Sequence, residues 1–174
     1  FLKENAKFAL GIVTGNNKEY ISAEKRSDNE LVLRGSDIQR YRVCTSGNYI
    51  RFVPESFQQV APIEIYRAKE KLLYRFISEV PVFTYDNKQT LSLNSCNIVI
   101  PEIDGLAIKY VLAILNSSVV AFFISKKFNS VKLLRSHIEQ VPIPIVSVEE
   151  QDNIINKVDR IMNSSENISG LYSE

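Results

Sequence analysis

The segment at residues 106–128, LAIKYVLAILNSSVVAFFISKKF, restricts the fold more than any other part of the chain. It is apolar almost all round, which predicts a helix buried in a core. Asn116-Ser117-Ser118 interrupts the apolar run at residues 110–124, so we expect the helix to break or restart there. The same break argues against a membrane span, which needs about 20 consecutive apolar residues.

The cysteines and the first residues of the chain bear on its location. Cys44 and Cys96 are far apart and form no C-x-x-C pair, and no basic and apolar leader opens the sequence. We therefore expect no disulfide framework, no zinc site, no secretion, no membrane insertion and a cytoplasmic location. A chain of 174 residues with 45% hydrophobic content can form one core of ordinary size.

Short β segments joined by turns fill residues 1–60. YRVC and YIRF flank the turn TSGN at residues 45–48 and predict a hairpin. Residues 65–79 predict a short helix, or a helix running into a strand, that ends at Pro81. The expected fold class is α+β: a twisted, mostly antiparallel sheet with a buried helix and a trailing amphipathic C-terminal helix.

The alternation of apolar residues changes phase at Asn94-Ser95. Leu91 and Leu93 alternate in one phase, whereas Cys96, Ile98 and Ile100 alternate in the other. A bulge or short loop at this point would resolve the conflict and aim both polar side chains outward. The alternative is a strand buried on both faces, with Val99 packed on the second one.

The chain changes character after the proline-rich joint at residues 141–146. Ser147 and Glu150 form an S-x-x-E capping box, and apolar residues recur at helical spacing through residue 162. Residues 147–174 carry six acids and two bases, a charge of −4, and residues 1–146 carry 19 bases and 14 acids, or +5. We therefore divide the chain into a mildly basic domain, 1–146, and a C-terminal spacer or docking helix, 147–174, whose polar end should fray.

The stretch GIVTGNNKEY at residues 11–20 contains two glycines beside a lysine. It lacks the order of a nucleotide-binding P-loop, because no glycine directly precedes Lys18. Gly15, Asn16 and Asn17 tolerate positive φ angles, so the stretch predicts a tight turn between two strands.

Residues for catalysis are scarce. His137 is the only histidine, which leaves little from which to build a Ser-His-Asp triad or a histidine metal site. The Asn/Asp-Pro-Pro-Tyr/Phe tetrapeptide with which amino-methyltransferases hold a flipped base is absent. A nuclease site can be sketched from Asp37 or Glu64 with Glu70 and Lys71, but the Glu-x-Lys spacing is missing.

Basic residues cluster without acids between Asp104 and Glu139. Most of them lie in KKFNSVKLLR at residues 126–135, where three lysines and one arginine lie next to Phe128, Asn129 and Ser130. Such a segment can follow a DNA backbone, because Lys and Arg displace condensed counterions and Asn and Ser donate to phosphate oxygens. The alternative is a solvated loop. A second basic group, Arg67 to Arg75, is partly offset by acids.

Several segments occur in an order that is found in a known family. They are GIVTGNNKEYI at residues 11–21, LVLRGSDIQRY at 31–41, YIRF at 49–52, EKLLYRFI at 70–77, SLNSCNIVI at 92–100, YVLAILNSSVVAFFI at 110–124 and IEQVPIPIVSVEEQDNIINKV at 138–158. Together they resemble the TaqI-like C-terminal specificity domain. That family is the target-recognition part of adenine-specific DNA methyltransferases and type II restriction-modification enzymes, and it is similar to the recognition domains of type I specificity subunits.

The resemblance implies a set of DNA-binding residues and an architectural role for Asn116-Ser117. Asn16 and its neighbours lie near the DNA side in the family, where Asn can pair with adenine and Lys with guanine or phosphate, and Gly11 and Gly15 would let the backbone come close. The DNA-binding set is Thr14, Gly15, Asn16, Asn17, Lys18, Arg34, Arg40, Lys71, Arg75, Lys126, Lys127, Lys132 and Arg135.

The methyltransferase portion that should precede such a domain is missing from this sequence. We expect a non-catalytic chain, either an excised fragment or a separate specificity chain, with S-adenosylmethionine bound on the missing lobe and no cofactor of its own. Its expected partners are double-stranded DNA and a methyltransferase or restriction lobe. Half of a type I specificity subunit and a stand-alone nuclease remain as alternatives.

Overall fold

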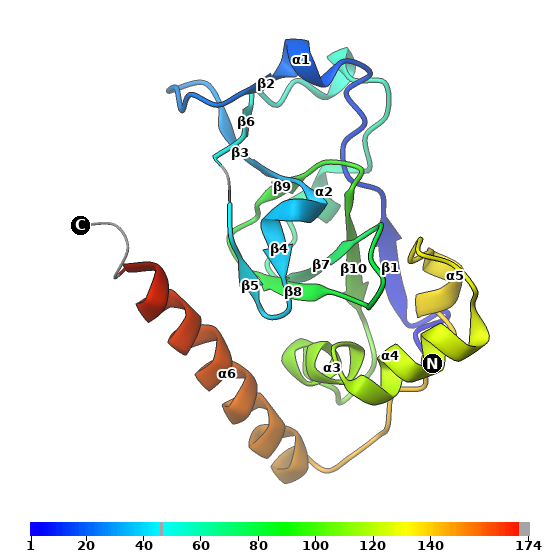
Figure 1. The fold of residues 1–174 in the computed structure, drawn as a ribbon. Coiled ribbons are helices and arrows are strands. Elements are labelled where there is room, and N and C mark those ends of the chain that lie inside the picture. Colours follow the sequence, from blue (N-terminus) through cyan, green and yellow to red (C-terminus); the bar gives the residue numbers. More distant parts are fainter. Residues whose placement is uncertain (46, 171–174) are drawn as a thin grey trace.

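The computed structural model describes residues 1–45 and 47–170 (Figure 1). The strands are β1 (Ala6–Ala9), β2 (Ile21–Ser22), β3 (Glu30–Leu33), β4 (Ile38–Gln39), β5 (Arg42–Val43), β6 (Tyr49–Ile50), β7 (Lys71–Arg75), β8 (Phe83–Asp86), β9 (Leu91–Ser92) and β10 (Cys96–Pro101). The helices are α1 (Asn17–Tyr20), α2 (Ile63–Tyr66), α3 (Ile108–Leu115), α4 (Ser118–Lys127), α5 (Arg135–Ile138) and α6 (Val148–Gly170), with 3-10 turns η1 (Gly35–Asp37) and η2 (Pro54–Ser56).

The strands form two four-stranded sheets and a small ribbon. The first sheet has the order β1-β10-β7-β8 and is antiparallel throughout. The second has the order β2-β6-β3-β9, in which only β3 and β9 run parallel, and β4 pairs with β5. The predicted α+β class is confirmed, although the strands divide between two sheets where we expected one.

Both faces of the first sheet are covered. Leu72 and Val99 belong to the core against α3 and α4, whereas Leu73 and Ile98 belong to the core shared with the second sheet. Because the strands are buried on both sides, apolar residues occupy successive positions in them. A turn also separates β9 from β10 at Asn94-Ser95, and both residues are exposed. The predicted short loop is therefore confirmed. The alternative, a strand buried on both faces with Val99 packed on the second one, holds for β10 as well.

The hairpin predicted for YRVC and YIRF is wrong. β5 pairs with β4 across a tight turn at Arg40-Tyr41, where Tyr41 has a φ of 68°. β6 pairs instead with β2 and β3, and this buries Ile50 fully. Gly47 has a φ of +73°, a backbone conformation that suits glycine, but Ser46 of the predicted turn lies outside the described residues. Both side chains of β5 are exposed, so pairing β5 with β6 would bury no apolar surface. The two strands therefore pair with other partners.

The apolar segment forms α3 and α4, which meet at the predicted break and are bent by 57°. Asn116 caps the end of α3, and its side-chain amide bonds both backbone groups of Phe83, Oδ1 accepting from the N–H at 3.0 Å and Nδ2 donating to the carbonyl at 2.9 Å. α3 is buried as predicted, but α4 exposes 73% of Val119 and 64% of Phe122, so burial of the whole segment is a wrong prediction. Among the helices described, none alone has the length and apolar character to cross a membrane.

The helix-into-strand version of residues 65–79 is confirmed by α2 and β7. The capping box of α6 is also confirmed: the N–H of Ser147 donates to Glu150 Oε2 at 3.0 Å, and the N–H of Glu150 donates to Ser147 Oγ at 3.3 Å. α6 continues past residue 162 to Gly170, and residues 171–174 of the predicted frayed end lie outside the described residues. α6 packs on α3 and pairs Asp159 with Lys109 at 2.6 Å.

Candidate nucleic-acid interface

The turn at Asn94-Ser95 fastens several loops to one another. The N–H of Asn94 donates to the carbonyl of Ile12 at 3.1 Å, which holds the segment leading to α1. Ser95 Oγ accepts from the N–H of Gly35 at 3.0 Å, and the Ser95 carbonyl accepts from the N–H of Phe76 at 3.0 Å. These bonds draw segments far apart in the sequence to one end of β10.

The basic segment joins the same assembly through backbone bonds. The N–H of Leu133 donates to the carbonyl of Phe76 at 2.8 Å, and the N–H of Ser78 donates to the carbonyl of Val131 at 2.9 Å. Leu133 is only 4% exposed, so it anchors a loop whose neighbours Val131 and Lys132 remain exposed. We name the resulting surface the loop face and define it as residues 10–18, 34–37, 75–80, 93–95 and 130–135.

A ring stack closes the basic segment on itself. The rings of Phe128 and His137 lie 4.1 Å apart and nearly parallel, at 15°. His137 is 8% exposed, and burial lowers its pKa below the ordinary histidine value. The only histidine of the chain therefore has a structural role, and its imidazole is neutral at pH 7. Its contact with Phe128 joins the two ends of the loop that carries Lys132.

The predicted turn at residues 14–18 is present, but it leads into the one-turn helix α1 and not directly into a strand. Gly15 has a φ of +84°, a backbone conformation that suits glycine. Thr14 is 4% exposed, and its hydroxyl donates to Asn17 Oδ1 at 2.7 Å, so Thr14 supports the turn from inside. Asn16, Asn17 and Lys18 are exposed on the outer side.

Gly11 allows a close approach within the protein and not toward a ligand. A Cβ atom built on Gly11 would lie 2.1 Å from the carbonyl oxygen of Leu93, so no side chain fits there. The expectation that Gly11 lets the backbone approach DNA is therefore corrected. The glycine instead lets the segment before α1 lie against the Asn94-Ser95 turn.

Three predicted arginines are half-buried. Arg75 donates from Nε to the carbonyl of Gly35 at 2.8 Å and from Nη2 to that of Ile38 at 2.5 Å, so its guanidinium braces η1. Arg40 Nε donates to the carbonyl of Pro81 at 3.1 Å. Arg34 is different, because its buried Nε has no hydrogen-bond partner among the described residues. Arg34 thus contributes a half-buried positive charge beside the Asn94-Ser95 turn, while its Nε is an unsatisfied donor inside the described part of the protein.

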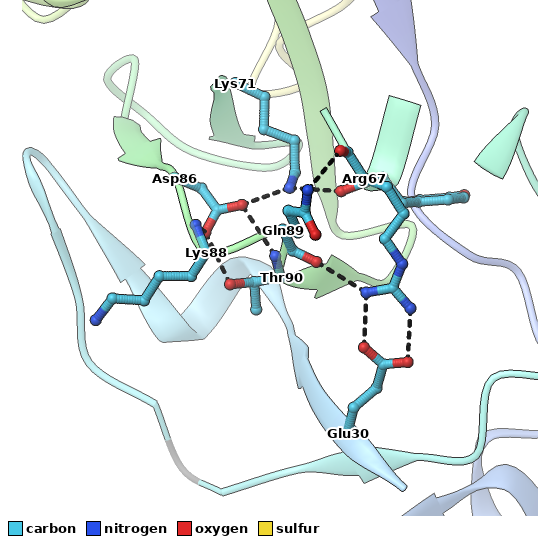
Figure 2. Close-up of polar contacts among 8 residues, drawn as sticks. Glu30, Arg67, Lys71, Asp86, Lys88, Gln89 and Thr90 are labelled. Carbon is cyan, nitrogen blue, oxygen red and sulfur yellow. Dashed lines mark hydrogen bonds and ion pairs between the residues drawn. The ribbon is translucent and has the colours of Figure 1, made fainter. Parts of the chain in front are cut away.

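Lys71 does not belong to the surface on which we predicted it. Its side chain is fully buried, pairs with Asp86 and donates to the carbonyl of Tyr66 at 2.8 Å (Figure 2). Burial lowers the pKa of Lys71, and the Asp86 carboxylate opposes that shift. The alternating pattern of β7 did not mark this lysine as internal, because its partner lies on the neighbouring strand β8. The DNA-contact prediction for Lys71 is corrected to a core ion pair.

The pair is part of a polar network at the end of the sheets opposite to Arg75. Arg67 binds both carboxylate oxygens of Glu30, at 2.7 and 2.6 Å, and donates to the carbonyl of Gln89 at 3.1 Å (Figure 2). Asp86 also accepts from Thr90, from the N–H at 3.0 Å and from the hydroxyl at 2.8 Å. Each of these buried or half-buried charges has a partner, so the network stabilises the junction of the sheets.

The cations of the basic segment are all exposed. Lys126 and Lys127 end α4, where positive charge is favoured by the helix dipole, and Lys127 lies 5.1 Å from the centre of the Phe123 ring. Arg135 lies 5.2 Å from the Phe8 ring centre and pairs with Glu139 at 2.7 Å. The three lysines, including Lys132, make no ion pair within the described part of the chain.

Apart from the buried Lys71 and from Arg40 at the β4–β5 turn, most predicted residues belong to segments at one side of the molecule. Figure 1 shows α1 at one end, α4 and α5 at the other, and the N-terminal segment with β1 running between them. The Asn94-Ser95 turn is bonded to this segment through Ile12, and Gly35, which follows Arg34, is bonded to Ser95. Asn94 and Ser95 were not among the predicted contacts, although the phase change in the sequence was the signal that pointed to them.

The carboxylates sketched as a nuclease site do not meet. Asp37 is buried and accepts from the N–H of Arg34 at 2.7 Å, and Glu70 accepts from the hydroxyl of Tyr85. Lys71 is committed to Asp86 in the core. No group of His, Cys, Asp or Glu suited to holding a metal ion occurs within residues 1–45 and 47–170.

Comparison with known proteins gives one family and several similar folds. Residues 30–143 match the model of the TaqI-like C-terminal specificity domain. A search of curated proteins finds no match.

The similar structures include a type I R-M system chain, at a TM-score of 0.59 and 16% identity over 96% of this chain and 38% of that one. Another is the type IIL restriction-modification enzyme MmeI in complex with DNA, at a TM-score of 0.63 and 8% identity. The match covers 92% of this chain and 28% of that one. A further one is the HsdS subunit from Thermoanaerobacter tengcongensis, at a TM-score of 0.56 and 17% identity. The match covers 99% of this chain and 39% of that one. At these identities the likeness concerns the fold, and the chain spans well under half the length of each.

Proposed function

The chain belongs to the TaqI-like C-terminal specificity domain family of restriction-modification enzymes, and on that basis we propose that it recognises a specific sequence in double-stranded DNA. It would do so for an adenine methyltransferase whose catalytic lobe is a separate part of the same or a partner chain. S-adenosylmethionine would bind on that lobe. This chain would place the lobe on its target and would carry out no chemistry itself.

The main support for this function is the arrangement of charged and amide side chains on the loop face. Hydrogen bonds join its loops to the Asn94-Ser95 turn, directly or through Phe76. The loop face displays the exposed Lys18 and Lys132, the half-buried Arg34 and exposed amides. Cations contribute affinity by releasing counterions from the phosphates, and amides distinguish base edges in the major groove. A fixed arrangement of both kinds of group is what sequence-specific binding requires.

MmeI gives this proposal additional support, because that enzyme has been solved in complex with DNA and shares the fold over most of this chain. The two type I structures support a second candidate, in which the chain is half of a specificity subunit. α6 would then join a second copy, and Ile161, which is 44% exposed, is an apolar side chain on which that copy could pack. Analytical ultracentrifugation separates the two: a dimer that dissociates in Ile161→Glu favours the second candidate, and a monomer favours the first.

The proposed function is tested by the salt dependence of duplex binding. In the triple variant Lys126→Gln, Lys127→Gln, Lys132→Gln, the negative slope of log K against log salt should become shallower by about 0.9 for each phosphate that is no longer neutralised, or about 2.7 for three. A matched control changes Lys25, Lys88 and Lys157 to Gln, which are also exposed and lie outside both the loop face and the basic segment at residues 126–135. Equal slopes for the two variants would remove the basic segment from the interface.

A further inference from the structure

The side chain of Asn94 has hydrogen-bonding capacity that the fold does not use. Asparagine in turns commonly bonds its own backbone two residues on, which explains its frequency there. Asn94 makes no side-chain hydrogen bond within the described residues, and it is exposed. The neighbouring Ser95 is the opposite case, because its hydroxyl accepts from the N–H of Gly35 and is committed to the fold.

The position of Asn94 is fixed without its amide. Its backbone N–H donates to Ile12 at 3.1 Å, and the next residue holds both Gly35 and Phe76. The turn also joins β9, which pairs with β3, to β10, which lies inside the first sheet. Because these bonds fix the backbone of the turn, the Asn94 amide is held in place before a ligand arrives. A ligand that binds this amide therefore loses little affinity to conformational entropy.

We propose that Asn94 is a specificity-determining residue that reads the edge of an adenine in the major groove. The Asn carboxamide carries an acceptor and a donor side by side, and adenine presents the complementary pair, N6–H and N7, in that groove. The side chain is short, so the turn itself has to enter the groove, which at about 12 Å is wide enough for a two-stranded ribbon. Asn94 can have this role only if the chain binds duplex DNA as proposed above.

The surroundings of the turn suit an approach to DNA. Arg34, a half-buried cation, directly precedes the Gly35 that bonds Ser95. Lys132 lies on the loop that is bonded through Leu133 to Phe76 on the other side of the turn. Cations on both sides of an unused amide would hold the phosphates of the two strands while the amide faces the base edges between them.

The test uses the 174-residue chain and a pool of synthetic duplexes with a randomised window of about 10 base pairs, one helical turn. Rounds of binding and sequencing give the base preference at each position for the natural chain, Asn94→Ala and Asn87→Ala. Asn87 is an exposed turn asparagine at the other end of the β7–β8 pair, and it controls for removal of an exposed amide.

The natural chain should select a motif in which Asn94→Ala weakens the preference for adenine at one position, by about 5- to 150-fold, and keeps the other positions. Asn87→Ala should select the natural motif. If Asn94→Ala also selects the natural motif unchanged, Asn94 reads no base, although the chain still recognises DNA. If the natural chain enriches no motif and retains no duplex at low salt, the proposed function itself is wrong and the role of Asn94 falls with it.

Discussion

Replacing Lys71 separates its structural role from the DNA contact that the sequence suggested. In Lys71→Met the buried Asp86 is left without its cation but keeps the N–H of Thr90 at 3.0 Å, the Thr90 hydroxyl at 2.8 Å and the N–H of Lys88 at 3.2 Å. Removing one partner of a buried ion pair costs about 3–5 kcal/mol, because the remaining charge is uncompensated. The remaining donors place the destabilisation at the lower end, about 3 kcal/mol, or a fall in Tm of about 6–12 °C for a chain of this size.

A second substitution tests the electrostatic origin of that destabilisation. Lys71→Met with Asp86→Asn removes both charges and leaves an amide oxygen to accept bonds in the turn. The double variant should therefore be more stable than Lys71→Met alone, by about 1–2 kcal/mol. Lys69→Met, at an exposed position two residues away, should change the free energy of unfolding by less than about 0.5 kcal/mol.

Urea unfolding followed by circular dichroism measures these free energies, and duplex binding is measured at a temperature where every variant is folded. Lys71→Met should bind duplex DNA as tightly as the natural chain. A decrease in stability under about 1 kcal/mol together with weaker DNA binding would refute the assignment of Lys71 to the core.

Three further predictions concern the loop face and its support. Asn16→Ala and Lys18→Ala should change which duplex sequence is selected, and equal weakening on selected and random DNA would make them backbone contacts. Gly11→Ala should destabilise the chain to urea, because its Cβ would lie 2.1 Å from the Leu93 carbonyl oxygen; unchanged stability would refute that close approach. Burial lowers the pKa of His137 in the folded state, so the unfolded chain binds its proton more readily and the free energy of unfolding should fall as the pH drops below 6.5. His137→Gln should flatten that fall between pH 6.5 and the folded-state pKa, and an unaltered pH profile would contradict the buried environment.

The sequence predicted the features that depend on neighbouring residues. The break at Asn116-Ser117, the capping box of α6 and the turn at Asn94-Ser95 all follow from local pattern, and all are present. The hairpin predicted around Gly47 was wrong. Strand pairing depends on which side chains can be buried together, and the exposed β5 gave no such information.

The long-range features could not be predicted for a related reason. Lys71 and Arg75 lie on the same strand in similar sequence surroundings, yet one is buried against Asp86 and the other braces η1. The burial of Gly11 against Leu93 likewise depends on two segments that meet only in the fold. Charge and amide content suggested a DNA-binding surface, whereas the bonds that assemble the loop face become visible only in three dimensions.

Hydrogen exchange of the chain with and without a selected duplex at low ionic strength tests the central claim most directly. Bound DNA should slow exchange in residues 10–18, 93–95 and 130–135, and should leave the β8–β9 turn at residues 87–90 and the exposed part of α6 unchanged. Protection at the β8–β9 turn with none on the loop face, or no protection anywhere, would contradict the account.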